Sequence, residues 1–70
     1  MKFKEKGEIV LSRREELSIN QDDLVEMAGI TKKTLYMIET GKGNPSIVTL
    51  SSVLEVLGLE LNIQIKKTLE

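Results

Sequence analysis

The sequence predicts a small, mainly α-helical domain of four helices with one C-terminal β-strand, and three observations support this fold class. Apolar residues recur three and four positions apart as far as Gly58, which is the spacing of helices buried along one side. A side chain that caps helices (Asn20, Thr31 or Ser46) stands just before each of three apolar stretches. After Gly58 the apolar spacing changes to every second residue, which is typical of a half-buried strand.

Composition limits the ways in which so short a chain can be stabilised. The 70 residues include neither cysteine nor histidine, which excludes disulfides and the usual zinc sites. A single core of this size is marginal by itself, so the sequence favours a second subunit or very regular helix packing. No apolar run approaches the roughly 20 residues of a membrane span. We therefore expect a cytoplasmic protein with no membrane contact, metal or cofactor.

Acidic and basic residues are distributed unevenly, although the formal net charge is only −1. Acids gather at residues 15–16 and 22–26, whereas bases gather at residues 2–6, 32–33 and 42. A basic cluster attracts phosphate locally, and an ordinary solvated face would show the same pattern. Asp22 and Asp23 are adjacent at the start of a predicted helix, where they complement its dipole rather than converge on a substrate. No enzyme chemistry is therefore expected.

The N-terminal quarter of the chain is expected to hold an arm and one helix. Residues 1–6 alternate apolar and basic side chains, which predicts a mobile arm or a short strand. The helical spacing of Val10, Arg14 and Leu17 then predicts a first helix over residues 7–17.

Two short helices joined by a tight turn are predicted next. Asn20 caps the first of them, residues 21–28, and Gly29 ends it because glycine accepts the left-handed conformation of a helix C-terminus. Thr31 caps the second, residues 32–39. The inward apolar positions of the two helices are Leu24, Met27, Ala28, Leu35 and Ile38.

A fourth helix and a strand complete the chain. Ser46 caps this helix after the loop of residues 42–45, and Gly58 ends it. Its apolar stripe is Ile47, Leu50, Val53, Leu54 and Leu57. Residues 59–67 are predicted to form a dimerisation strand, followed by a tail over residues 68–70. The apolar face of this strand is Leu59, Leu61, Ile63 and Ile65.

A lone strand exposes unpaired backbone groups along both edges, so the C-terminal strand requires a partner. One candidate is the same strand of a second subunit, paired antiparallel about a two-fold axis. The other is the segment of residues 1–5 of the same or another chain. The first is favoured because the C-terminal strand is longer and its alternation cleaner.

The central and C-terminal segments resemble a known family. The shared residues of the centre are Asn20-Gln21, Leu24, Ala28-Gly29-Ile30-Thr31, Leu35, Ile38-Glu39 and Gly41, and those that follow are Asn44-Pro45-Ser46, Leu50 and Leu57-Gly58-Leu59. In this register the chain resembles the Cro/C1-type, or XRE-like, helix-turn-helix regulators. The resemblance implies a lambda-repressor-like domain of about five segments that binds double-stranded DNA. The added strand is similar to the one in HipB-like antitoxins, which implies an intersubunit sheet.

The third helix is the candidate DNA reader, because a helix fits the major groove and its N-terminal residues meet base edges. The outward residues expected at bases are Lys32, Lys33, Thr34 and Met37. The residues expected at phosphates are Gln21, Tyr36, Thr40, Lys42 and Asn44. Other roles remain open: a solvated face for the lysines, packing for Met37 and Tyr36, capping for Gln21 and turn formation for Asn44.

The resemblance also implies a salt bridge between Arg14 of the first helix and Glu39 of the third. Two features depart from the family. Arg13 stands where an apolar residue is usual, so Val10 must pack more extensively or Arg13 must lie along the surface. Lys32-Lys33 replaces the amide or small residues common at the start of the recognition helix, which leaves the base preference open.

The function expected from these features is that of a homodimeric transcriptional repressor bound to a palindromic operator. Two alternatives remain. One is an antitoxin that neutralises a toxin partner and regulates its own operon. The other is a dimerising adaptor that binds no DNA, which the net charge of −1 supports.

Overall fold

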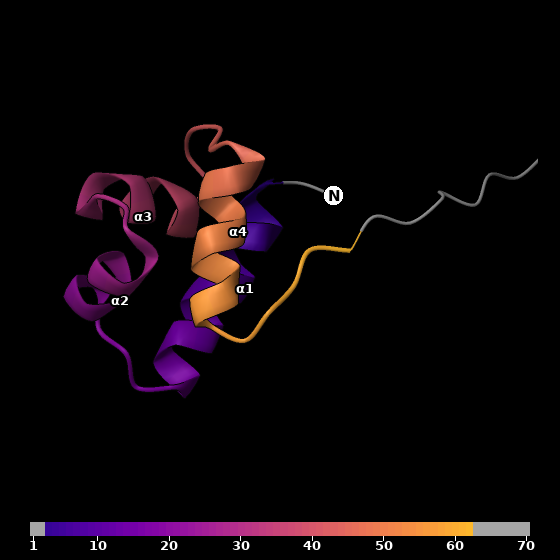
Figure 1. Cartoon of the computed structure of the whole chain (residues 1–70). Helices are drawn as coiled ribbons and strands as arrows, with labels where there is room; N and C mark the ends of the chain where they lie inside the picture. The colour runs from indigo at the N-terminus through magenta and orange to yellow at the C-terminus, as the bar shows by residue number, and fades with distance from the viewer. Residues whose placement is uncertain (1–2, 63–70) are drawn as a thin grey trace, which may run out of the picture.

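The computed structural model describes residues 3–62, and every regular element in this range is a helix. The helices are α1 (Phe3–Glu16), α2 (Gln21–Ala28), α3 (Lys32–Glu39) and α4 (Ile47–Val56). In Figure 1, α2 and α3 lie together on one side of α4, and α1 lies behind α4. The prediction of a mainly helical, four-helix domain is confirmed. No helix within residues 3–62 is long and apolar enough to cross a bilayer.

The two ends of the chain differ from the expectation or lie outside the described range. Residues 3–6, predicted as part of an arm or short strand, form the first turn of α1. Lysine and glutamate favour helix, and an alternation over so few residues is a weak strand signal. Residues 59–62 contain no strand, whereas residues 63–67, with Ile63 and Ile65, lie outside the described residues.

Local side-chain chemistry sets the helix boundaries. The caps Asn20, Thr31 and Ser46 each accept a hydrogen bond from the backbone N–H three residues on, at 2.8, 3.1 and 3.1 Å. Gly29 and Gly58 then end α2 and α4 in the left-handed region, each with φ of 71°. These caps satisfy backbone groups that the helix termini leave unpaired.

The end of α1 uses an unusual residue for the same purpose. Ser18 takes the left-handed conformation with φ of 58°, although glycine is the common residue there. The N–H of Ile19 donates to the carbonyl of Arg14 and the N–H of Ser18 to that of Glu15, both at 3.0 Å. This pair of bonds turns the chain sharply from α1 into α2.

All four helices contribute to one hydrophobic core. Its fully or largely buried residues are Val10, Leu24, Leu35, Ile38, Leu50, Val53, Leu54 and Leu57. Three apolar residues of the predicted stripes are exposed instead, namely Leu17, Met27 and Ile47. Each stands in the terminal turn of its helix or just beyond it.

The structure shows how Val10 and Arg13 are placed at the position where the chain departs from the family. Val10 is buried in the core, and Arg13 is half-buried beside it on α1. Nε of Arg13 donates to the carbonyl of Leu57 at 2.9 Å, and Nη1 pairs with Glu16 at 2.8 Å. A cation at this position is stabilised by the negative end of the α4 dipole. Arg13 therefore attaches α1 to the C-terminus of α4.

Gly7 allows α1 to approach the C-terminal end of α3 very closely. A Cβ atom placed on Gly7 would lie 2.1 Å from the carbonyl oxygen of Ile38 and 3.1 Å from that of Glu39. Only glycine therefore fits this crossing. An isolated glycine inside a helical pattern is the sequence signal for such a contact, but the prediction used Gly7 only as a helix start.

Candidate nucleic-acid interface

The helix α3 places the candidate base-contacting residues on its outer side, while Leu35, Ile38 and Glu39 are buried beneath it. Lys32, Lys33 and Tyr36 are exposed, and Thr34 and Met37 are half-buried. A three-residue turn follows α2, and the first residues of α3 after it are exposed. The structure thus brings Lys32 and Lys33 together at the first turn of an accessible helix.

The side chains of Thr34 and Met37 are more buried than those of the two lysines. The Oγ1–H of Thr31 donates to Oγ1 of Thr34 at 2.9 Å, which ties Thr34 into the cap of α3. Met37 packs against the loop after α3, because a Cβ on Gly43 would lie 2.9 Å from its Cε. Met37 therefore packs against this loop with one part of its side chain and remains exposed with the other.

Glu39 accepts hydrogen bonds from two other elements below α3. Nε of Arg14 lies 2.6 Å from Oε2 of Glu39, and Nη2 donates to Oε1 at 3.2 Å. The two side chains are only 12% and 5% exposed, respectively. Nη1 of Arg14 also donates to the carbonyl of Ile19 at 3.0 Å. This is the pair expected from the family, and it joins α1 to α3.

Gln21 completes the same network from the first position of α2. Its Nε2 donates to Oε1 of Glu39 at 3.0 Å. A side-chain amide has two N–H donors, so this bond leaves the second one for another acceptor. The sequence did not indicate the bond to Glu39, because it depends on how α2 and α3 cross in space.

The Arg14 side chain stays protonated in this network. The hydrogen bond to Glu39 raises the pKa of the Arg14 guanidinium above its usual value, and Coulombic attraction to Glu39 and Glu15 acts in the same direction against burial. Arg14 is therefore a permanent cation beneath the interface. Its charge is directed at Glu39 and the Ile19 carbonyl rather than outward.

An acidic side chain borders the candidate base-contacting residues. Oδ1 of Asp22 in α2 lies 3.1 Å from Nζ of Lys32, and the two side chains are 75% and 61% exposed. The sequence assigned Asp22 only to the helix dipole. Its pairing with Lys32 depends on how α2 and α3 cross in space.

The candidate phosphate contacts at the C-terminal end of α3 also lie at the surface. Thr40, Lys42 and Asn44 are exposed, and Oγ1 of Thr40 donates to the carbonyl of Tyr36 at 2.8 Å. Nζ of Lys42 stands 5.9 Å from the centre of the Tyr36 ring. A cation at this distance is attracted by the face of the ring. Tyr36 thus faces Lys42, rather than serving only as packing against α2.

The sequence of this chain matches known proteins. A model of the helix-turn-helix family matches residues 10–64, which is more than half of the chain. An uncharacterized HTH-type transcriptional regulator of Methanothermobacter thermautotrophicus is 31% identical over 52 residues, covering 74% of this chain and 75% of that protein. The chain therefore belongs to the helix-turn-helix family, as a DNA-binding transcription regulator of the Cro/C1, or XRE-like, type.

Proposed function

We propose that the protein is a transcriptional repressor that binds a palindromic operator as a homodimer, with α3 of each protomer in the major groove. The observation that carries this proposal is the composition of the accessible face of α3. It begins with two exposed lysines, and its opposite face is fixed by a buried ion pair. A helix presented in this way offers its first turn to base edges and its flanks to phosphates.

The residues divide into two roles in the proposed complex. Lysine donates to guanine O6 and N7, and a threonine or methionine side chain contacts the methyl group of thymine. Phosphates accept from side-chain amides and hydroxyls and from the free backbone N–H groups at a helix N-terminus. The proposed base contacts are Lys32, Lys33, Thr34 and Met37. The proposed phosphate contacts are Gln21, Tyr36, Thr40, Lys42 and Asn44.

Replacing both Lys32 and Lys33 by alanine is the experiment that tests this function. We expect DNA affinity to fall by at least about tenfold, and the slope of log affinity against log salt to become shallower by up to about 4, because each protomer of the dimer loses two cations. Fluorescence anisotropy with a duplex selected by the wild-type protein from a random pool measures both quantities. Lys32→Arg with Lys33→Arg is the matched control, because it keeps both charges.

The proposal would be overturned by a double alanine variant that binds as tightly as the wild type while melting at the same temperature. Retained binding would mean that another surface holds the DNA. Loss of binding with retention in the arginine control supports phosphate or base contact through the two cations.

An apolar groove between α1, α4 and the segment after α4 supports the proposed homodimer. It has a volume of about 470 Å³. Its lining residues are Lys6, Ile9, Val10, Leu50, Leu54, Leu59, Glu60, Leu61 and Asn62. Leu59 and Leu61, predicted for the dimer strand, thus line a groove rather than extend a strand within the described residues. The segment leaves α4 on the side away from α2 and α3 (Figure 1).

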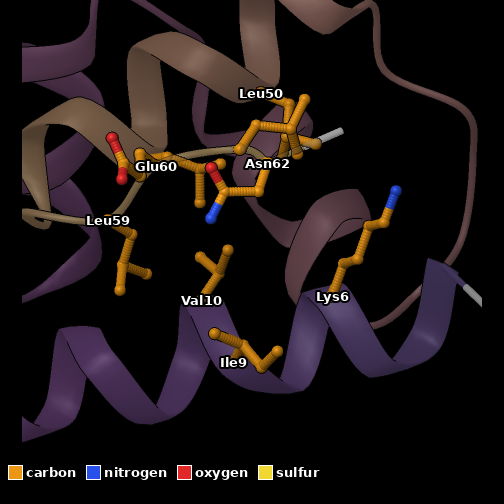
Figure 2. A pocket seen from close by; sticks show the side chains of 9 residues that line it. Lys6, Ile9, Val10, Leu50, Leu59, Glu60 and Asn62 are labelled. Carbon is orange, nitrogen blue, oxygen red and sulfur yellow. The ribbon is translucent and has the colours of Figure 1, made fainter. Parts of the chain in front are cut away.

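The charged residues at the ends of the groove complement one another under a two-fold axis. Figure 2 shows Lys6 at one end and Glu60 beside Leu59 at the other, with Ile9 between them. In an interface with two-fold symmetry, every contact between two different residues occurs twice, once in each direction between the protomers. A two-fold axis through the middle of the groove brings Lys6 of one protomer towards the partner's Glu60. In this arrangement the apolar middle is buried and both charged ends are paired.

Charge reversal tests the proposed dimer independently of DNA. Lys6→Glu or Glu60→Lys alone is expected to weaken dimerisation by about tenfold, since symmetry disrupts two pairs, and the two changes together to restore it. Sedimentation equilibrium of the full chain measures the constant. Val48→Glu, an exposed apolar position that does not line the groove, is the control. A wild type that stays monomeric, or a double variant weaker than both single variants, contradicts this interface.

A further inference from the structure

The Asp22–Lys32 pair occupies the position where the proposed function needs a free cation. Lys32 is the first residue of α3, and its Nζ lies 3.1 Å from Oδ1 of Asp22. A carboxylate at this distance offers the amine the same kind of oxygen that a DNA phosphate offers. In the protein without DNA, Lys32 is therefore already bound to an internal anion.

We propose that Asp22 is a specificity-determining residue that competes with DNA phosphate for Lys32 and so suppresses binding to DNA of arbitrary sequence. The inference rests on the proposed role of α3 as the reading helix. To reach a phosphate, the Lys32 amine must leave Asp22, and the carboxylate then remains unpaired beside the negatively charged DNA. Both effects weaken a complex held by phosphate contacts alone.

The suppression is selective because the two kinds of complex depend on Lys32 differently. Binding to arbitrary DNA comes essentially from phosphate neutralisation and counterion release. In a specific complex, a lysine that meets a guanine edge gains directional hydrogen bonds, which offset the loss of Asp22. Asp22 therefore lowers non-specific affinity more than operator affinity, and it raises the ratio between them.

The small number of cations on this face makes one internal competitor effective. The basic side chains at the candidate interface are Lys32, Lys33 and Lys42, in a chain whose net charge is −1. Lys33 is exposed and forms no ion pair with any side chain of residues 6–62. Lys42 faces the Tyr36 ring. Lys32 is thus the one of these three that a carboxylate holds directly.

Asp23 provides a matched control for the charge of Asp22. Both acids stand in the first turn of α2 and both are exposed. Asp23 pairs with no cation among residues 6–62, whose side chains the structure describes. Replacing either by asparagine removes one negative charge and the same favourable interaction with the helix dipole. A difference between the two variants therefore reports the contact with Lys32.

The test compares Asp22→Asn and Asp23→Asn on two duplexes by fluorescence anisotropy. One duplex has an arbitrary sequence of about 30 base pairs, which is long enough for two half-sites one helical turn apart. The other is selected by the wild-type protein from a random pool. We expect Asp22→Asn to raise affinity for the arbitrary duplex by about tenfold and to steepen its salt slope by about 1.8, as one more phosphate is neutralised by each protomer of the dimer. Affinity for the selected duplex should rise less, so the specificity ratio falls.

A double-mutant cycle identifies Lys32 as the target of Asp22. In a Lys32→Ala background, Asp22→Asn should raise non-specific affinity no more than Asp23→Asn does. Equal effects of Asp22→Asn and Asp23→Asn in the wild-type background would overturn the inference, as would an unchanged specificity ratio. Either result leaves the proposed function standing if Lys32→Ala with Lys33→Ala still weakens DNA binding by at least about tenfold. Binding retained in that variant would instead overturn the proposed function.

Discussion

Replacing Glu39 by alanine is expected to lower the free energy of unfolding by about 3–5 kcal/mol, because the change leaves a buried guanidinium without its partner. Glu39 receives hydrogen bonds from Nε and Nη2 of Arg14 and from Nε2 of Gln21. Alanine removes all three acceptor contacts at once. The links from α1 and α2 to the end of α3 are then lost. The domain is therefore less stable, and the recognition helix is no longer held in place by these contacts.

Urea denaturation followed by circular dichroism measures this effect. Glu16→Ala is the control, since Glu16 also pairs with an arginine of α1 but its side chain is 69% exposed. Exposed pairs contribute roughly 0–1 kcal/mol, so this variant should unfold almost like the wild type. Equal midpoints for Glu39→Ala and Glu16→Ala would show that the buried pair does not hold the helices together. Replacing Arg14 and Glu39 together by methionine should be milder than Glu39→Ala, because no unpaired charge remains.

Gly7→Ala is expected to have the second large effect on stability. The sign of this change in the free energy of unfolding distinguishes a packing effect from an effect of helix propensity. In an exposed helix interior, alanine is more favourable than glycine by about 1 kcal/mol. At Gly7 the added Cβ would lie 2.1 Å from the carbonyl oxygen of Ile38, which is fixed backbone. The two helices must therefore move apart and disturb the core around Val10. We expect destabilisation of about 1–3 kcal/mol, as for an overpacked core.

Thermal melting of Gly7→Ala and Ser12→Ala tests this contact. Ser12 is an exposed residue of the same helix, where alanine should be neutral or slightly stabilising. A Gly7→Ala variant that melts at or above the wild-type temperature would mean that α1 and α3 do not approach as closely as described. A lower melting temperature for Gly7→Ala alone supports the close crossing.

Features that depend on neighbouring residues in the chain were predictable from the sequence. The caps Asn20, Thr31 and Ser46 and the stops Gly29 and Gly58 all occur where expected, since each acts within one helical turn. The start of α1 was placed four residues too late. Its first turn has few apolar residues to show a helical period, and short alternation is equally compatible with a strand.

The site was predictable in part, for the same reason. Helical spacing alone indicated that Lys32 and Lys33 face outward while Leu35 is buried. The bonds from Gln21 to Glu39 and from Asp22 to Lys32 were not indicated, because they depend on the crossing of α2 and α3. The contact of Met37 with Gly43 likewise depends on the path of a loop. Local patterns identify which side chains face outward, but not which of them are already paired.

The favoured form of the strand prediction concerns an interaction between two chains. A strand requires hydrogen bonds from a neighbour, and the preferred neighbour was the second subunit. Within one chain, residues 59–62 instead follow the apolar groove, with Leu59 and Leu61 in its lining. The apolar alternation was therefore a correct indicator of partial burial for these two residues, whereas the strand itself stays a prediction.

The central claim is that α3 reads DNA, and amide chemical-shift mapping tests it most directly. The ¹⁵N-labelled protein is titrated with the duplex selected from a random pool, and the shifts of all backbone amides are followed. We predict the largest changes at the start of α2 and along residues 31–37, with smaller ones over residues 40–44. Changes confined to α1 and residues 59–62, with the amides of α3 unmoved, would contradict the assignment of α3 as the recognition helix.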